Sequence, residues 1–148
     1  MMTAELNRSR RKIAVKIVAD AYAWIEIFLG SEKGSKAKEI LESADEVYTP
    51  DTALAEIARK YLREGTGEKT TTERLGIVTS ASDLTHVDVR VALEAAKCYI
   101  QMSTNAKKQK LKAPSLFDAI VLATSRVFEA KVLTGDEHFR NLPETLWL

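Results

Sequence analysis

The chain has 148 residues, of which 45% are hydrophobic and 29% are charged, with a formal net charge of +1 and one cysteine, Cys98. This length and composition predict a single globular domain, and one cysteine excludes an intramolecular disulfide and agrees with a reducing compartment. The near-neutral charge gives no sign of nucleic-acid binding, and the longest apolar stretch, 19–29, contains Asp20 and Glu26 and is too short to span a bilayer. We therefore expect a cytoplasmic protein without a membrane segment.

The first twelve residues differ from the rest in their charge. Met1–Lys12 contains three arginines and a lysine, and no long apolar run of the kind that marks a signal peptide follows it. We interpret residues 1–12 as a basic N-terminal extension, with disorder as one expectation, and residues 13–148 as a single domain.

From residue 13 onward, strand-like and helix-like segments alternate. We expect strands at 13–18, 46–49, 83–87, 131–134 and 145–148, which are mostly short and apolar. We expect helices at 21–29, 36–43, from Pro50 onward, 70–80, 88–102 and from Pro114 onward, and an exposed lysine-rich loop at 105–113. Strands separated by helices predict an α/β fold, a three-layer α/β/α sandwich with a mostly parallel central sheet.

Four acidic residues lie near the ends of these elements. Asp20 and Asp136 follow strands, Asp118 lies near a helix start, and Glu56 lies within a helix. Each alone has an ordinary explanation as a cap, a turn residue or a solvated helix residue. Because ligands of open α/β sheets bind at the carboxyl ends of the strands, we expect the four to converge there.

Four converging carboxylates point to a cation. Two carboxylates about 4 Å apart repel by roughly 4 kcal/mol at an effective dielectric of about 20, so a group of four must share protons or hold metal ions. Carboxylates without cysteine or histidine ligands suit Mg²⁺ or Mn²⁺ rather than zinc. Such a site activates water for attack on a phosphoryl group, which is nuclease or phosphatase chemistry.

The acids lie in the segments Ile17-Val18-Ala19-Asp20-Ala21, Thr49-Pro50 with Ala55-Glu56, Phe117-Asp118-Ala119-Ile120 and Leu133-Thr134-Gly135-Asp136-Glu137-His138-Phe139. Together these segments resemble a known family, the PIN domains, and in particular the single-domain VapC-type toxin ribonucleases. The resemblance implies a Mg²⁺- or Mn²⁺-dependent endoribonuclease that cleaves RNA, forms a homodimer and is inhibited by a cognate antitoxin protein. It also implies that Asp20, Glu56, Asp118 and Asp136 are the catalytic and metal-binding acids, and that the Thr134 hydroxyl supports the last of them. Ala19 before Asp20 and the length of the N-terminal extension depart from the family pattern.

Further residues are candidates for substrate contact. Lys107, Lys108 and Lys110, with Lys112 beside them, form a basic run that is either a solvated loop or a contact to the RNA backbone, and we include Thr134 among the candidate contacts. His138 follows Asp136 closely enough for substrate contact or proton transfer, but we favour a turn residue because nothing in the sequence orients its ring.

Two other functions remain open at this stage. One is an aspartyl phosphotransferase with Asp20 as nucleophile, although Tyr22 occupies the position where a second acid is expected. The other is a protein of the same fold that binds RNA or a partner without turnover.

Overall fold

The structure is a computed structural model that describes residues 13–148, so the basic extension predicted at 1–12 lies outside the described residues. The elements follow one another in the order β1 (Lys16–Ala19), α2 (Ala21–Leu29), α3 (Glu32–Ser43), β2 (Glu46–Pro50), α4 (Thr52–Arg63), α5 (Glu68–Ala81), β3 (Asp83–Thr85), α6 (Val89–Lys108), α7 (Leu116–Phe128), β4 (Lys131–Thr134), the short 3₁₀ helix η1 (Glu137–Phe139) and β5 (Thr145–Trp147). No helix among these residues is long and apolar enough to cross a bilayer.

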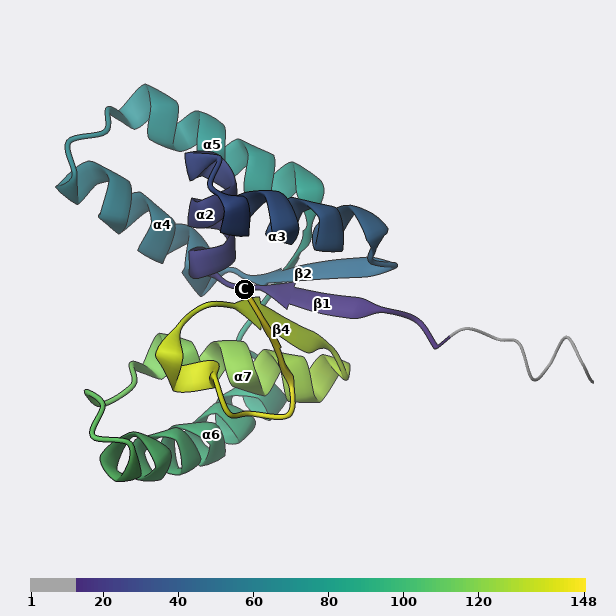
Figure 1. The fold of residues 1–148 in the computed structure, drawn as a ribbon, viewed down its shortest axis with the longest axis vertical. Coiled ribbons are helices and arrows are strands. Elements are labelled where there is room, and N and C mark those ends of the chain that lie inside the picture. The colour runs from purple at the N-terminus through teal and green to yellow at the C-terminus, as the bar shows by residue number, and fades with distance from the viewer. Residues whose placement is uncertain (1–12) are drawn as a thin grey trace, which may run out of the picture.

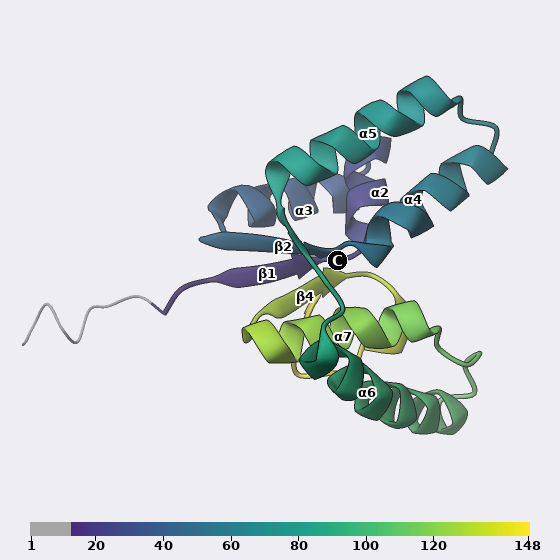
Figure 2. The same cartoon turned by 180° about the vertical axis from the view of Figure 1, so that it is seen from behind.

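The five strands form one sheet in the order β3-β2-β1-β4-β5, with every neighbouring pair parallel. Helices α2 to α5 lie on one face of the sheet, and α6 and α7 lie on the other (Figures 1 and 2). The predicted α/β sandwich is confirmed, and its sheet is parallel throughout. The chain adds β2 and β3 on one side of β1 and then β4 and β5 on the other, so the strand order switches between β1 and β4.

The central strand β1 is buried on both faces because its side chains alternate between two cores. Ile17 and Ala19 pack with α2 to α5, whereas Val18 packs with α6 and α7. Neighbouring β4 repeats the pattern, with Leu133 in the first core and Val132 in the second. Burial on both faces explains why the two strands read as continuous apolar runs in the sequence.

Two predicted boundaries near the sheet edge were wrong. Pro50 ends β2 instead of opening a helix, and Asp51 donates its backbone N–H to the Thr85 carbonyl before α4 begins at Thr52. Helix α6 runs on to Lys108, beyond the predicted end at 102, because its buried stripe continues through Met102 to Ala106. The exposed loop is therefore 109–115, and Lys107 and Lys108 lie on the last turn of α6.

The packing of α3 on α2 yields a stability prediction. A Cβ atom at Gly34 would overlap the backbone carbonyl of Glu26, whereas a Cβ at Gly76 in α5 would meet nothing within 4 Å. We expect Gly34→Ala to lower the free energy of unfolding by about 1–3 kcal/mol, because the two helices would have to move apart. Gly76→Ala is the matched control and should leave stability unchanged or raise it by up to about 1 kcal/mol. Urea denaturation measures both, and equal stability of Gly34→Ala and wild type would contradict this account of the packing.

Candidate active site

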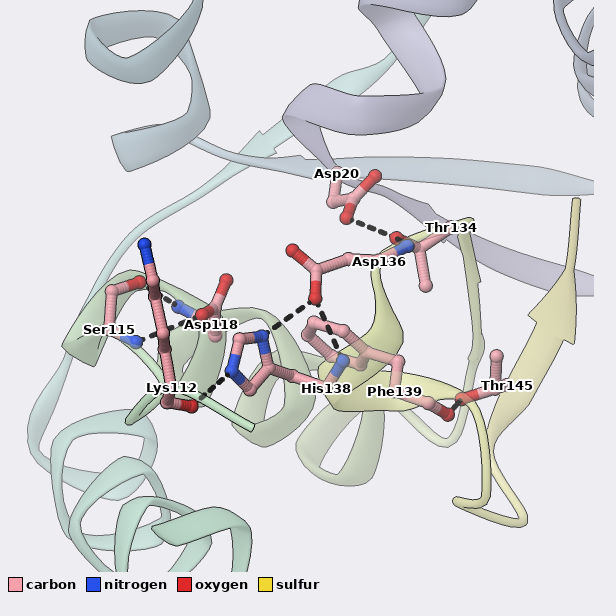
Figure 3. Close-up of polar contacts among 9 residues, drawn as sticks. All are labelled: Asp20, Lys112, Ser115, Asp118, Thr134, Asp136, His138, Phe139 and Thr145. Carbon is pink, nitrogen blue, oxygen red and sulfur yellow. Dashed lines mark hydrogen bonds and ion pairs between the residues drawn. The ribbon is translucent and has the colours of Figure 1, made fainter. Parts of the chain in front are cut away.

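The four predicted acids come from four different elements near the carboxyl ends of the strands. Asp20 follows β1, Asp136 follows β4 by two residues, Asp118 is in the first turn of α7, and Glu56 is in α4, which starts just after β2. Ala19 pairs with Leu133 in the sheet, so the next residues along, Asp20 and Thr134, lie side by side at the point where the strand order switches. Figure 3 shows Asp20, Asp118 and Asp136 around one region. This is where open α/β sheets bind their ligands.

Asp20 is the most buried of the four, with 7% of its surface exposed. One carboxylate oxygen accepts the Ala23 N–H at 3.0 Å and so caps the N-terminus of α2, and the other accepts the Thr134 hydroxyl at 2.6 Å. Burial raises the pKa of Asp20 to about 7 despite these two hydrogen bonds, with smaller contributions from the charges of Asp136 and Glu56. The protein therefore holds this carboxylate in place without compensating its charge.

Thr134 connects the first acid to the last. Its hydroxyl donates to Asp20 and accepts the backbone N–H of Asp136 at 3.1 Å. The side chain is completely buried between the two acids that its hydroxyl contacts, and its contact with substrate stays a prediction. Gly135 between them leaves room for Tyr22, because a Cβ at this position would overlap the Tyr22 ring unless that side chain moved.

Asp118 is oriented by the N-terminus of its own helix. The Ser115 side chain accepts the Asp118 N–H at 3.1 Å, and one carboxylate oxygen of Asp118 accepts the Ser115 N–H at 2.9 Å. This capping box engages one oxygen and fixes the direction of the other. Burial and the charge of Asp136 raise the pKa of Asp118 against the opposing effect of the Ser115 hydrogen bonds.

Glu56 is coupled to the other acids by electrostatic repulsion. Burial first, and then the negative charges of Asp118 and Asp136, raise its pKa to about 7, while Arg59 acts in the opposite direction. The four acids therefore influence one another, although Glu56 comes from the middle of a helix. Three of them have raised pKa values, because they are buried close to like charges.

The sequence of this domain matches a known family. A family model for the PIN domain matches residues 17–144. The chain belongs to the PIN-domain family. The resemblance predicted from the sequence is thus confirmed, and a search of curated proteins finds no match.

Solved structures of low sequence identity share the PIN fold. A toxin–antitoxin complex from Klebsiella pneumoniae is 19% identical with a TM-score of 0.60, and the match covers 88% of this chain and 95% of that one. A VapC toxin from Mycobacterium tuberculosis that cleaves the sarcin–ricin loop is 19% identical with a TM-score of 0.65, over 83% of this chain and 92% of that one. A VapBC complex from Rickettsia felis bound to promoter DNA is 10% identical with a TM-score of 0.65, and the match covers 90% of this chain and 98% of that one.

The PIN domain also places a histidine at the site, where the sequence had favoured a turn residue. Ligand atoms of Asp118, Asp136 and His138 lie within 4.8 Å of one another. His138 Nδ1 lies 2.8 Å from Asp136 Oδ1, and Nε2 lies 2.8 Å from the Lys112 carbonyl oxygen (Figure 3). Both partners accept hydrogen bonds, so they raise the pKa of His138 although burial alone would lower it. The sequence could not reveal that the His138 ring contacts the Lys112 carbonyl, because Lys112 lies 26 residues before His138.

The donor set of the PIN domain fits a hard divalent cation. Asp118 and Asp136 each keep one oxygen outside the hydrogen bonds described here, and both nitrogens of His138 already have partners. Carboxylate oxygens would therefore supply the ligands, as Mg²⁺ and Mn²⁺ prefer. The structure does not bring the predicted lysines among these acids. Lys107, Lys108 and Lys110 are exposed, and Lys110 has a positive φ of 56° in the loop after α6.

The raised pKa of Glu56 determines how stability depends on pH in metal-free protein. Its pKa rises from 4.5 when unfolded to about 7 when folded, so folding takes up a proton and stability falls as pH rises through this window. Glu56→Gln removes this effect, and allowing for partial exposure we expect it to raise stability at about pH 8 by about 1 kcal/mol, or about 3 °C in Tm. The difference should vanish at about pH 4.

Thermal unfolding in EDTA measures this difference. Glu39→Gln, on the exposed face of α3, removes the same charge and should leave Tm unchanged at both pH values. If Glu56→Gln melts at the wild-type temperature at about pH 8, Glu56 does not carry an uncompensated charge.

Proposed function

We propose that this PIN domain is an endoribonuclease that depends on Mg²⁺ or Mn²⁺ and hydrolyses phosphodiester bonds of RNA. The single observation that carries the proposal is the convergence of four carboxylates, three of them with raised pKa values, on the switch point of the sheet. A cation bound there would relieve their repulsion, and its charge would draw a phosphate group into an otherwise negative site.

Each acid has a part in the proposed reaction. Asp118 and Asp136 would hold the cation, and Asp20, kept in place by Thr134 and the start of α2, would add its negative charge beside them. When bound, Mg²⁺ or Mn²⁺ supplies charge stabilisation at the phosphoryl oxygens and lowers the pKa of water. Glu56 would orient the attacking water and accept one of its protons, while the water oxygen bonds to phosphorus and the opposite P–O bond breaks. The departing ribose oxygen takes a proton from solvent, and Glu56 later returns its own proton to solvent. No covalent enzyme intermediate is needed.

The toxin assignment is part of this proposal. Structures that share the fold include toxins and toxin–antitoxin complexes, which supports a cytoplasmic toxin paired with a cognate antitoxin protein. We also infer a homodimer, as the family resemblance implies. Size-exclusion chromatography with light scattering tests the dimer, and co-purification with the product of an adjacent short gene tests the antitoxin.

Phosphotransfer by Asp20 fits the structure less well. A nucleophilic carboxylate needs an accessible oxygen, yet Asp20 is 7% exposed and both of its oxygens already accept hydrogen bonds. A protein that binds RNA without turnover would keep the fold but would not need the mutual positioning of Asp20 and Asp136 by one hydroxyl.

The nuclease proposal predicts the effect of removing one carboxylate. Asp118→Asn keeps the side chain able to accept the Ser115 N–H but removes a charge that would hold the cation, so we expect RNA cleavage to fall by at least about 100-fold. Cleavage of a structured RNA is measured with Mg²⁺, with Mn²⁺ and with EDTA, which should abolish it.

Glu39→Gln on the exposed face of α3 is the control and should cleave at the wild-type rate. Divalent-dependent cleavage by Asp118→Asn at the wild-type rate would show that the mechanism is wrong. RNA binding by the wild type without any cleavage would favour the binding protein.

A further inference from the structure

The loop 109–115 between α6 and α7 is attached to the acidic site at two points. At its end, Ser115 exchanges two hydrogen bonds with Asp118. In its middle, the carbonyl oxygen of Lys112 lies 2.8 Å from His138 Nε2, and His138 Nδ1 lies 2.8 Å from Asp136 Oδ1. Each attachment therefore leads to a carboxylate that we assign to the cation.

The His138 ring connects the loop to Asp136 and has little freedom to move. Only 19% of its side chain is exposed, and its own backbone N–H also donates to Asp136 Oδ1 at 2.9 Å. The ring thus bridges residues that are 24 positions apart in the sequence, Lys112 and Asp136, with a hydrogen-bond partner on each nitrogen. In Figure 3 it lies between them.

The attachment also places a lysine next to the site. The backbone carbonyl of Lys112 contacts His138, while its side chain is exposed. In the view of Figure 3 this side chain extends away from His138 and rises between Ser115 and Asp118. An amino group that reaches past the acids from this loop would suit a phosphate of the bound strand next to the one that is cleaved.

We propose that His138 is a positioning residue that holds the loop 109–115 on Asp136, so that Lys112 contacts the RNA backbone beside the acidic site. This inference rests on the proposed function for its substrate. It singles out Lys112 from the basic run as the phosphate contact, and it gives His138 a role other than that of a turn residue. A merely structural role for His138 would stabilise the loop without affecting how Lys112 binds RNA.

Kinetics of single and double variants separate these possibilities. Lys112→Ala should raise KM about fivefold to tenfold for a single-stranded oligonucleotide, leave kcat within about twofold, and reduce the slope of log affinity against log salt by about 0.7. Lys112→Arg keeps the charge and should restore KM. His138→Ala should raise KM to a similar extent and also lower kcat, because Asp136 loses a hydrogen-bond partner.

The double variant decides whether one residue acts through the other. In the Lys112→Ala background, His138→Ala should raise KM no further, because the contact it positions is already gone. Lys97→Ala is the matched control, since it removes an exposed charge from α6 away from the loop, and its effect on KM should simply add to that of His138→Ala. Additive effects of His138→Ala and Lys112→Ala, or a wild-type KM for Lys112→Ala, would overturn the inference.

A readout independent of RNA keeps the attachment testable if the proposed function fails. Trypsin cleaves after lysine, so His138→Ala should accelerate cleavage after Lys110 and Lys112 by at least about fivefold relative to cleavage elsewhere, because the loop is released. Unchanged cleavage would show that His138 does not hold the loop. Wild-type protein that neither cleaves nor binds RNA would overturn both the nuclease proposal and the role of Lys112, whereas a nuclease with unaffected variants would overturn this inference alone.

Discussion

The hydrogen bond from Thr134 to Asp20 is the interaction on which the site depends. It joins the carboxyl ends of β1 and β4 at 2.6 Å, in the buried centre of the sheet where the strand order switches. The same hydroxyl accepts the Asp136 N–H, and the other oxygen of Asp20 caps α2. One threonine therefore sets the distance between two acids and connects a helix to both strands. A hydrogen bond to a carboxylate is stronger than one between neutral groups, which helps a buried charge to persist in this place.

The acids oppose folding in the absence of a cation, and the fold tolerates them because the two cores are otherwise apolar. Burial raises the pKa of Asp20 and of Glu56 to about 7, so at neutral pH the native state carries incompletely ionised carboxylates. Residues 17–19 and 132–133, which precede the site in β1 and β4, are fully buried and supply the opposing stabilisation. Electrostatic strain at the end of well-packed strands is typical of sites that bind a ligand of opposite charge.

The sequence predicts the parts of this arrangement that depend on local pattern. Asp20 and Asp136 follow apolar runs, so their place at the sheet edge could be inferred from strand ends alone, and Asp118 from its position beside Ser115 at a helix start. The end of β2 at Pro50 could not be inferred in this way, because it depends on the hydrogen bond from the Asp51 N–H to Thr85 of a different strand. His138 was undervalued for the same reason, since its ring is oriented by the backbone of Lys112. Long-range hydrogen bonds to backbone atoms leave no trace in residue type, which is why the boundary at Pro50 and the orientation of His138 were missed.

The net charge of +1 had argued neither for nor against a nucleic-acid partner, and the fold explains why it is a poor guide. The acids are gathered at the ends of β1 and β4 and on the facing turns of α4 and α7, while lysines occupy the end of α6 and the loop after it. A cation bound by the acids would change the sign of the local charge without changing the sequence total. In the proposed nuclease, the cation at the reacting phosphate and Lys112 beside it would then both present positive charge to the RNA. A chain of nearly zero net charge would thereby attract a polyanionic substrate at the place where the proposed chemistry occurs.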